Sequence, residues 1–242
     1  MATDRAPLPT PAPRPAGSRV RTGDAATGLA AVLWDMDGTL VDTEPFWIRA
    51  ETELVTAHGG TWTQDDAHAL VGLDLLDAAG YIRRVGGVDM APAAIVELMM
   101  ERVVEQMAAT PPWRPGALDL LAALRDAGIP SVLVTMSWRR LAGAVVDMLP
   151  PGSFAATVAG DEVERGKPHP EPYLAAADIV GVAPGSCVAI EDSPTGARSA
   201  RSAGCAVLGV PHVVDIPNDL VDETTESLTT ITVESLRSLV AR

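Results

Sequence analysis

Short apolar runs alternate along the chain with longer segments whose apolar residues recur every three or four positions. The short runs are apolar on both faces, a pattern typical of buried strands in a parallel sheet. They lie at 29–35, 130–136, 154–160, 186–192, 205–210 and 228–233. The segments with helical spacing lie at 116–128, 139–149, 170–181 and 194–204. This alternation predicts an α/β fold built on a doubly wound parallel sheet.

A long helical insertion separates the first two predicted strands. A strand-helix-strand unit takes roughly 30 residues, but the segment between the first two predicted strands is much longer. Its additional residues, 44–113, have helical spacing throughout. We therefore expect an all-helical cap domain at 44–113 and a sheet domain made of 29–43 and 114–242. Ligands of open parallel sheets bind beyond the carboxyl ends of the strands, so the cap is expected to cover the site. Residues 1–28 are rich in proline and are expected to form a disordered tail.

The composition narrows the class of protein. Hydrophobic residues make up 47% of the 242 residues and charged residues 21%, which is typical of a soluble globular protein. With 32 acidic and 18 basic residues the net charge is −14, which argues against nucleic acid as a partner. No apolar stretch approaches the roughly 20 residues of a membrane span, and the first residues lack the apolar segment of a secretory signal. We expect a cytoplasmic protein with no membrane partner, either a monomer or a small homo-oligomer.

Two carboxylates follow the first predicted strand. Asp35 and Asp37 are separated by one residue, so in an extended segment both side chains point to the same side. Like charges at this spacing disfavour each other unless a cation joins them, and oxygen ligands of this kind suit Mg²⁺. Gly38 allows the chain to turn away after them. The alternative is an acidic turn that only ends a strand.

Other predicted strands are followed by further polar residues. Thr135 and Ser137 come after the second strand, where hydroxyl and backbone N–H groups can cradle phosphate oxygens. Lys167 lies in a loop with two prolines, and its compact charge suits phosphate and carboxylate oxygens. Glu191 and Asp192 end a later strand, either as a helix cap or as further metal ligands. We expect these groups to meet the first carboxylate pair at one edge of the sheet.

Together the motifs resemble those of the haloacid dehalogenase-like phosphohydrolase superfamily. DMDGT at 35–39 is similar to its DxDGT hallmark, GKPHPEPY at 166–173 to its lysine motif, and IEDSPTGARSARSAG at 190–204 to its last motif. The resemblance covers about 29–210 and implies a Rossmann-like core with a helical cap after the first strand. Within the superfamily it implies the branch of the β-phosphoglucomutases and sugar phosphatases.

The resemblance also implies a mechanism. Asp35 would attack phosphorus and form an aspartyl phosphate, while Asp37 would protonate the leaving alkoxide and later deprotonate water. Mg²⁺ is the implied cofactor. Its implied ligands are Asp35, the main-chain carbonyl of Asp37, and Asp192, with Glu191 either a further ligand or the partner of Lys167.

The implied substrate is a small phosphorylated metabolite. DTEPFWIRAE at 42–51 is similar to the DSEPxWxRAE of phosphatases that act on sugar and polyol phosphates. Thr135, Lys167 and the backbone amides near Ser137 are implied to bind the phosphoryl group. Trp47, on the first cap helix, is expected to border the crevice.

Two other functions stay open. A sugar phosphomutase similar to β-phosphoglucomutase has a cap arginine three residues after a glycine that matches Gly72. This chain has Leu75 at that position, so a mutase would need Arg83 or Arg84 to bind the second phosphate. The other alternative is a catalytically silent protein that binds a phosphorylated metabolite. Dehalogenation is not expected, because the dehalogenases of the superfamily lack the second aspartate, which is Asp37 here.

Overall fold

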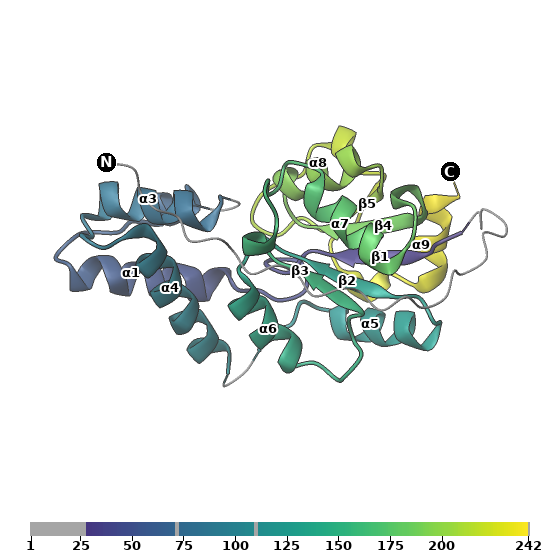
Figure 1. The fold of residues 1–242 in the computed structure, drawn as a ribbon, viewed down its shortest axis with the longest axis horizontal. Helices are drawn as coiled ribbons and strands as arrows, with labels where there is room; N and C mark the ends of the chain where they lie inside the picture. The colour runs from purple at the N-terminus through teal and green to yellow at the C-terminus, as the bar shows by residue number, and fades with distance from the viewer. Residues whose placement is uncertain (1–27, 71–72, 109–110, 242) are drawn as a thin grey trace, which may run out of the picture.

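The structure of the protein is a computed structural model that describes residues 28–70, 73–108 and 111–241 (Figure 1). These residues contain a six-stranded parallel sheet with the strand order β3-β2-β1-β4-β5-β6. The strands are β1 (Ala31–Trp34), β2 (Ser131–Val134), β3 (Ala156–Val158), β4 (Cys187–Glu191), β5 (Ala206–Gly209) and β6 (Glu223–Thr224). The first strand in sequence therefore lies in the middle of the sheet, with β2 on one side and β4 on the other.

Helices cover both faces of this sheet, as the two-sided apolar runs predict. Successive strand residues point to opposite faces, so Val32 and Trp34 of β1 belong to one hydrophobic cluster and Ala31 and Leu33 to another. The first cluster includes side chains of α5 (Ala117–Asp126), α6 (Arg139–Asp147) and α9 (Val233–Val240). The second includes those of α7 (Glu171–Val180) and α8 (Pro194–Ala203). The doubly wound architecture is confirmed.

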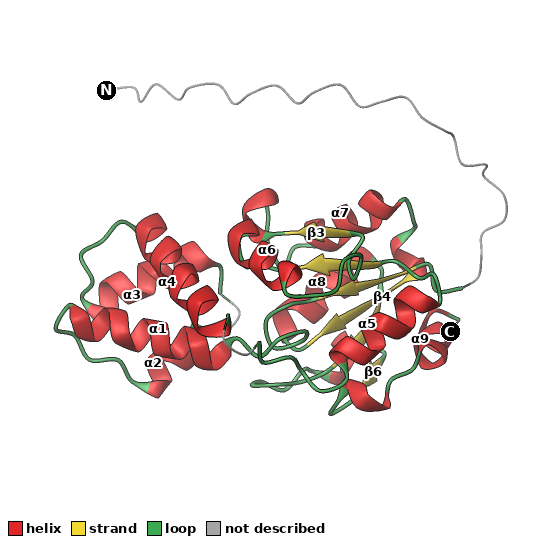
Figure 2. Ribbon diagram, turned by 90° about the horizontal axis from the view of Figure 1, so that it is seen from below, coloured by secondary structure: helices red, strands yellow, loops and turns green. Residues whose placement is uncertain are grey.

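The inserted segment forms a separate group of helices beside the sheet domain (Figure 2). Its helices are α1 (Glu44–Ala57), α2 (Gln64–His68), α3 (Leu75–Gly86) and α4 (Pro92–Met107), of which α4 packs against both α1 and α3. Val41 and Trp113, in the two connections to the sheet domain, form an antiparallel bridge. Asp42 N–H also donates to the Pro112 carbonyl at 2.9 Å. The chain therefore leaves and rejoins the sheet domain at adjacent points.

The strand predicted at 228–233 is wrong. Residues Leu228–Thr230 form a 3₁₀ turn, α9 begins at Val233, and the sixth strand is Glu223–Thr224. The hydroxyls explain the difference, because Ser227 accepts a hydrogen bond from Thr229 N–H and Thr232 accepts one from Ser235 N–H. Serine and threonine used in this way start helical turns instead of extending a strand.

Two predictions fall wholly or mostly outside the described residues. Of the predicted tail at 1–28 the structure describes only Gly28, and Gly72 is also outside. Within the described part of the chain, every helix is too short or too polar to cross a bilayer.

Candidate active site

The carboxyl ends of the three central strands bring the predicted residues together. Asp35 directly follows β1, Thr135 follows β2, and Glu191 and Asp192 lie at the end of β4. Because β1 pairs with both β2 and β4 in parallel, these ends lie at the same edge of the sheet. Lys167 reaches this edge from the loop between β3 and α7.

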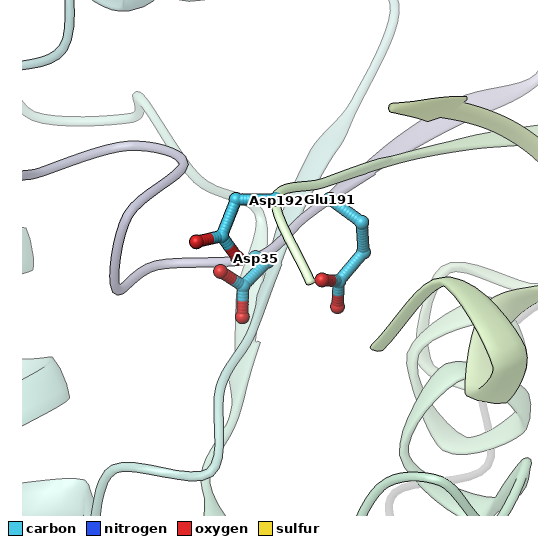
Figure 3. Close-up of side chains that lie close together, drawn as sticks. All are labelled: Asp35, Glu191 and Asp192. Atoms are coloured by element: carbon cyan, nitrogen blue, oxygen red, sulfur yellow. The ribbon is translucent and has the colours of Figure 1, made fainter. Parts of the chain in front are cut away.

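Three carboxylates meet at this edge of the sheet. Asp35, Glu191 and Asp192 each have an oxygen within 4.8 Å of the others (Figure 3). Gly38 has a φ of +84°, and a Cβ there would lie 2.1 Å from Asp192 Oδ2. The turn after the first strand therefore needs glycine for two reasons, its backbone conformation and the close approach of Asp192.

Lys167 joins two of the three carboxylates. Its Nζ donates to Asp35 Oδ1 at 2.7 Å, to Glu191 Oε1 at 2.6 Å and to the Val134 carbonyl at 2.9 Å. Burial alone would lower the pKa of Lys167, but the charges of Asp35 and Glu191 outweigh it and raise the pKa above its ordinary value. The lysine is therefore a fixed positive charge at neutral pH.

Glu191 is held by the protein on both of its oxygens. Tyr173 O–H donates to Oε1 at 2.6 Å and Ser193 O–H to Oε2 at 3.3 Å, in addition to the bond from Lys167. A Cβ on Gly196 would come within 1.8 Å of Oε1, so only glycine fits beside this carboxylate. The sequence indicated Glu191. Tyr173 is the last residue of the motif at 166–173, but its contact with Glu191 depends on the packing of α7 and was not predicted.

The site carries more negative than positive charge, with three carboxylates around one ammonium group. Burial is the main cause that raises the pKa of Asp35 to about 7; Lys167 opposes this effect and the neighbouring carboxylates add to it. Burial, together with Asp35 and Glu191, also raises the pKa of Asp192 well above its ordinary range. Asp35 Oδ2 is buried and has no hydrogen-bond partner in the described part of the chain. These oxygens fit a hard divalent cation, which would relieve the excess charge.

Asp37 is surrounded by hydroxyl groups. Thr43 O–H donates to Asp37 Oδ1 at 2.5 Å, and Ser137 and Thr135 donate to Oδ2 at 2.8 and 3.2 Å. Thr135 Oγ1 also accepts a hydrogen bond from Ser137 N–H at 3.0 Å. This carboxylate is positioned by three donors and has an environment distinct from that of Asp35. The sequence analysis did not single out Thr43, although it lies within the motif at 42–51.

A cavity of about 180 Å³ lies where the cap faces these groups. The predicted residues that line it are Asp35, Asp37, Ser137, Lys167, Asp192 and, from α1, Trp47. Thr135 and Glu191 lie behind the surface, where they hydrogen bond to Asp37 and Lys167. All eight predicted side chains therefore lie in or next to one site.

The cap side of the cavity holds a buried carboxyl group that the sequence analysis did not single out. Glu51 of α1 lines the cavity and is 6% exposed, and its Oε2 accepts a hydrogen bond from Trp62 Nε1 at 3.1 Å. Burial raises the pKa of Glu51 to about 8. Glu51 is seven residues after Glu44, which also lines the cavity. Glu51 is also the last residue of the motif at 42–51, which was the signal that could have found it.

Known proteins match both the sequence and the structure. The family described as haloacid dehalogenase-like hydrolase matches residues 29–204. Hexitol phosphatase A of Escherichia coli is 32% identical over 217 residues, which cover 83% of this chain and 92% of that protein. Protein CbbY of Rhodobacter capsulatus is 31% identical over 194 residues, 76% of this chain and 86% of that protein.

Solved structures agree with these matches. A CbbY mutant from Rhodobacter sphaeroides in complex with xylulose-(1,5)bisphosphate has a TM-score of 0.79 at 27% identity, and the match covers 86% of this chain and 99% of that one. β-Phosphoglucomutase from Clostridium difficile has a TM-score of 0.76 at 20% identity and shares the fold. The chain belongs to the haloacid dehalogenase-like hydrolases, in the branch that contains the sugar phosphatases, and is a phosphatase.

Proposed function

We propose that the protein is a Mg²⁺-dependent phosphatase that hydrolyses the monophosphate ester of a small sugar or polyol through an aspartyl phosphate on Asp35. The observation that carries this proposal is the environment of Asp35. One oxygen is held by Lys167, the other is buried with no partner among the described residues, and Asp35 lines the cavity. Asp35 Oδ2 is therefore free to form a bond to the phosphorus of a substrate in the cavity.

Asp35, Asp192 and the main-chain carbonyl of Asp37 would hold Mg²⁺. When bound, the ion would neutralise phosphoryl oxygens and favour the ionised carboxylates. Glu191 has both oxygens occupied by protein donors, so we assign it to holding Lys167 and not to the metal.

The chain's own residues divide the chemistry between two carboxylates. Asp35 attacks phosphorus and takes the phosphoryl group, while Asp37 donates a proton to the oxygen of the departing alcohol. Asp37 then removes a proton from water, which attacks phosphorus and releases phosphate from Asp35. Thr43, Thr135 and Ser137 keep Asp37 in place for both transfers. Lys167 offsets the repulsion between the carboxylate of Asp35 and the phosphate group of the substrate as they approach each other.

The substrate class rests on the cap. The motif at 42–51 resembles that of sugar and polyol phosphatases, and two relatives of this chain are named hexitol phosphatases. Lys167 is the only basic side chain among the described residues that line the cavity. Neither Arg83 nor Arg84 is among them, and Arg84 instead stacks over Tyr81 at 5.4 Å. A monophosphate therefore fits better than a bisphosphate, which disfavours the mutase alternative.

A panel of phosphorylated sugars and polyols, with p-nitrophenyl phosphate as a generic ester, tests the proposal. Phosphate release with Mg²⁺ is expected for the wild type and is expected to fall at least 100-fold in Asp35→Asn. Asp119→Asn, an exposed acid on α5, is the matched control and should match the wild type. Wild-type turnover by Asp35→Asn would exclude it as the nucleophile. Isomerised product without free phosphate would favour the sugar phosphomutase. Binding of a phosphorylated metabolite without turnover would favour the catalytically silent protein.

A further inference from the structure

The cap wall of the cavity is largely hydrocarbon. Its apolar members include Ile48, Leu70, Leu75, Ile82, Val96 and Met99. Among the described cap residues that line the cavity, the side chains able to hydrogen bond are those of Glu44, Trp47 and Glu51, and none carries a positive charge. The leaving group of a substrate would therefore contact mainly apolar side chains of the cap. The carboxyl groups that it could meet there are those of Glu44 and Glu51.

Glu51 stands at a distinct position along this wall. Glu44, Trp47, Ile48 and Glu51 have the i, i+3, i+4, i+7 spacing of one helix face. At 1.5 Å per residue, Glu51 lies about 10 Å along the helix axis from Glu44. Glu44 follows Thr43, one of the three residues that donate a hydrogen bond to Asp37. Glu51 is thus placed to meet a part of the leaving group remote from the scissile oxygen.

One oxygen of Glu51 is fixed and the other is free. Oε2 accepts the bond from Trp62 Nε1, and Trp62 packs edge to face against Tyr81 with ring centroids 5.9 Å apart. Oε1 has no hydrogen-bond partner among the described residues, although Glu51 is only 6% exposed. With its raised pKa, Glu51 is largely protonated at neutral pH and can donate as well as accept a hydrogen bond.

We propose that Glu51 determines specificity by hydrogen bonding one hydroxyl of the leaving group, within an apolar wall that selects monophosphate esters of uncharged alcohols. The inference rests on the proposed phosphatase function and narrows its substrate class. A hydroxyl that reaches Glu51 can hydrogen bond to Oε1, for which the described residues supply no partner. A hydroxyl that meets only the hydrocarbon wall loses its bonds to water without replacement, which favours the smaller alcohols within the proposed sugar and polyol class.

Two esters of equal length separate this role from general packing: butyl phosphate and 4-hydroxybutyl phosphate. The wild type is expected to prefer the hydroxylated ester by at least about tenfold in kcat/KM, mainly through KM. Glu51→Leu, which keeps the volume and removes the polar group, should abolish the preference by raising KM for 4-hydroxybutyl phosphate toward that for butyl phosphate. Glu51→Gln, which keeps a donor and an acceptor, should retain most of the preference.

Glu53→Gln is the matched control, because Glu53 lies on the same helix, pairs with Arg49 and Arg102, and does not line the cavity. Its preference should equal that of the wild type. If Glu51→Leu does not fold, Trp62→Phe supplies the second test: it removes the donor that positions Glu51 and should reduce the preference.

The outcomes are distinguishable from failure of the phosphatase proposal. If phosphate is released but the wild type shows no preference, or the preference survives in folded Glu51→Leu, the role of Glu51 is overturned and the phosphatase function is not. If the wild type releases no phosphate from either ester, from the sugar and polyol panel or from p-nitrophenyl phosphate, both proposals are overturned together.

Discussion

Gly38 and Gly59 offer a matched pair of substitutions that tests the position of Asp192. Both glycines have positive φ values, +84° and +79°. A Cβ on Gly59 has nothing within 4 Å, whereas a Cβ on Gly38 would lie 2.1 Å from Asp192 Oδ2. Alanine at either position therefore adds the same backbone strain, but only Gly38→Ala displaces a carboxylate of the site.

The magnitudes follow from this contrast. A left-handed conformation costs an L-residue about 1 to 2 kcal/mol, so both variants should lose roughly that much stability. Relief of the clash in Gly38→Ala requires Asp192 to retreat by roughly 1 Å, and a shift of this size at a reacting centre costs on the order of 100-fold in rate. If Asp192 holds Mg²⁺, the apparent affinity for the ion should fall roughly 10- to 100-fold.

Phosphate release measured across a Mg²⁺ titration, with thermal unfolding of each variant, tests the prediction. Gly59→Ala should keep the wild-type half-saturating concentration of Mg²⁺ and the wild-type turnover, despite its lower melting temperature. Gly38→Ala should need more Mg²⁺ and turn over more slowly. If the two variants give the same turnover and Mg²⁺ dependence, Asp192 does not hold the ion.

Three further predictions concern charge and proton transfer. Lys167→Met leaves the buried carboxylates Asp35 and Glu191 without their cation and should cost roughly 3 to 5 kcal/mol in urea unfolding and at least 100-fold in turnover; wild-type turnover would contradict the role of the lysine. Thr43→Val removes one of three donors to Asp37 and should slow turnover about tenfold, and an unchanged rate would refute that contribution. The metal-free protein should lose stability as pH rises from about 4 to 7, because burial raises the pKa of Asp35 to about 7 and the folded state holds the extra proton in that window; Mg²⁺ should remove this slope in melting temperature against pH, and a rising metal-free slope would contradict it.

The centre of the sheet was predictable because β1, β2 and β4 are buried on both faces. An apolar run such as 186–192 leaves few alternatives once helical segments surround it. The error at 228–233 arose where hydrophobicity is weaker and Ser227 and Thr232 use their hydroxyls as helix caps. The spacing of apolar residues carries no information on such local hydrogen bonds, so it predicted a strand where the chain forms a capped turn.

The site was predictable to the extent that its residues follow strands. Asp35, Asp37 and Asp192 each lie where a predicted strand ends, and the parallel topology brings these ends together. Tyr173 and Glu51 instead reach the site from helix faces, so their positions depend on how α7 and α1 pack. Strand ends can be located by counting along the chain, whereas the rotation of a helix against its neighbour depends on side-chain packing.

The bridge between the two connections has a consequence for how this enzyme can change. The cap leaves and returns at Asp42 and Pro112, which are hydrogen bonded to each other. The whole cap is therefore inserted at one place in the sheet domain. Closing a long loop costs little more entropy than closing a short one, so an insertion of this length is tolerated there. A different set of helices could replace it there without disturbing the strand ends. Preference for the alcohol can therefore diversify while the phosphoryl chemistry is inherited unchanged.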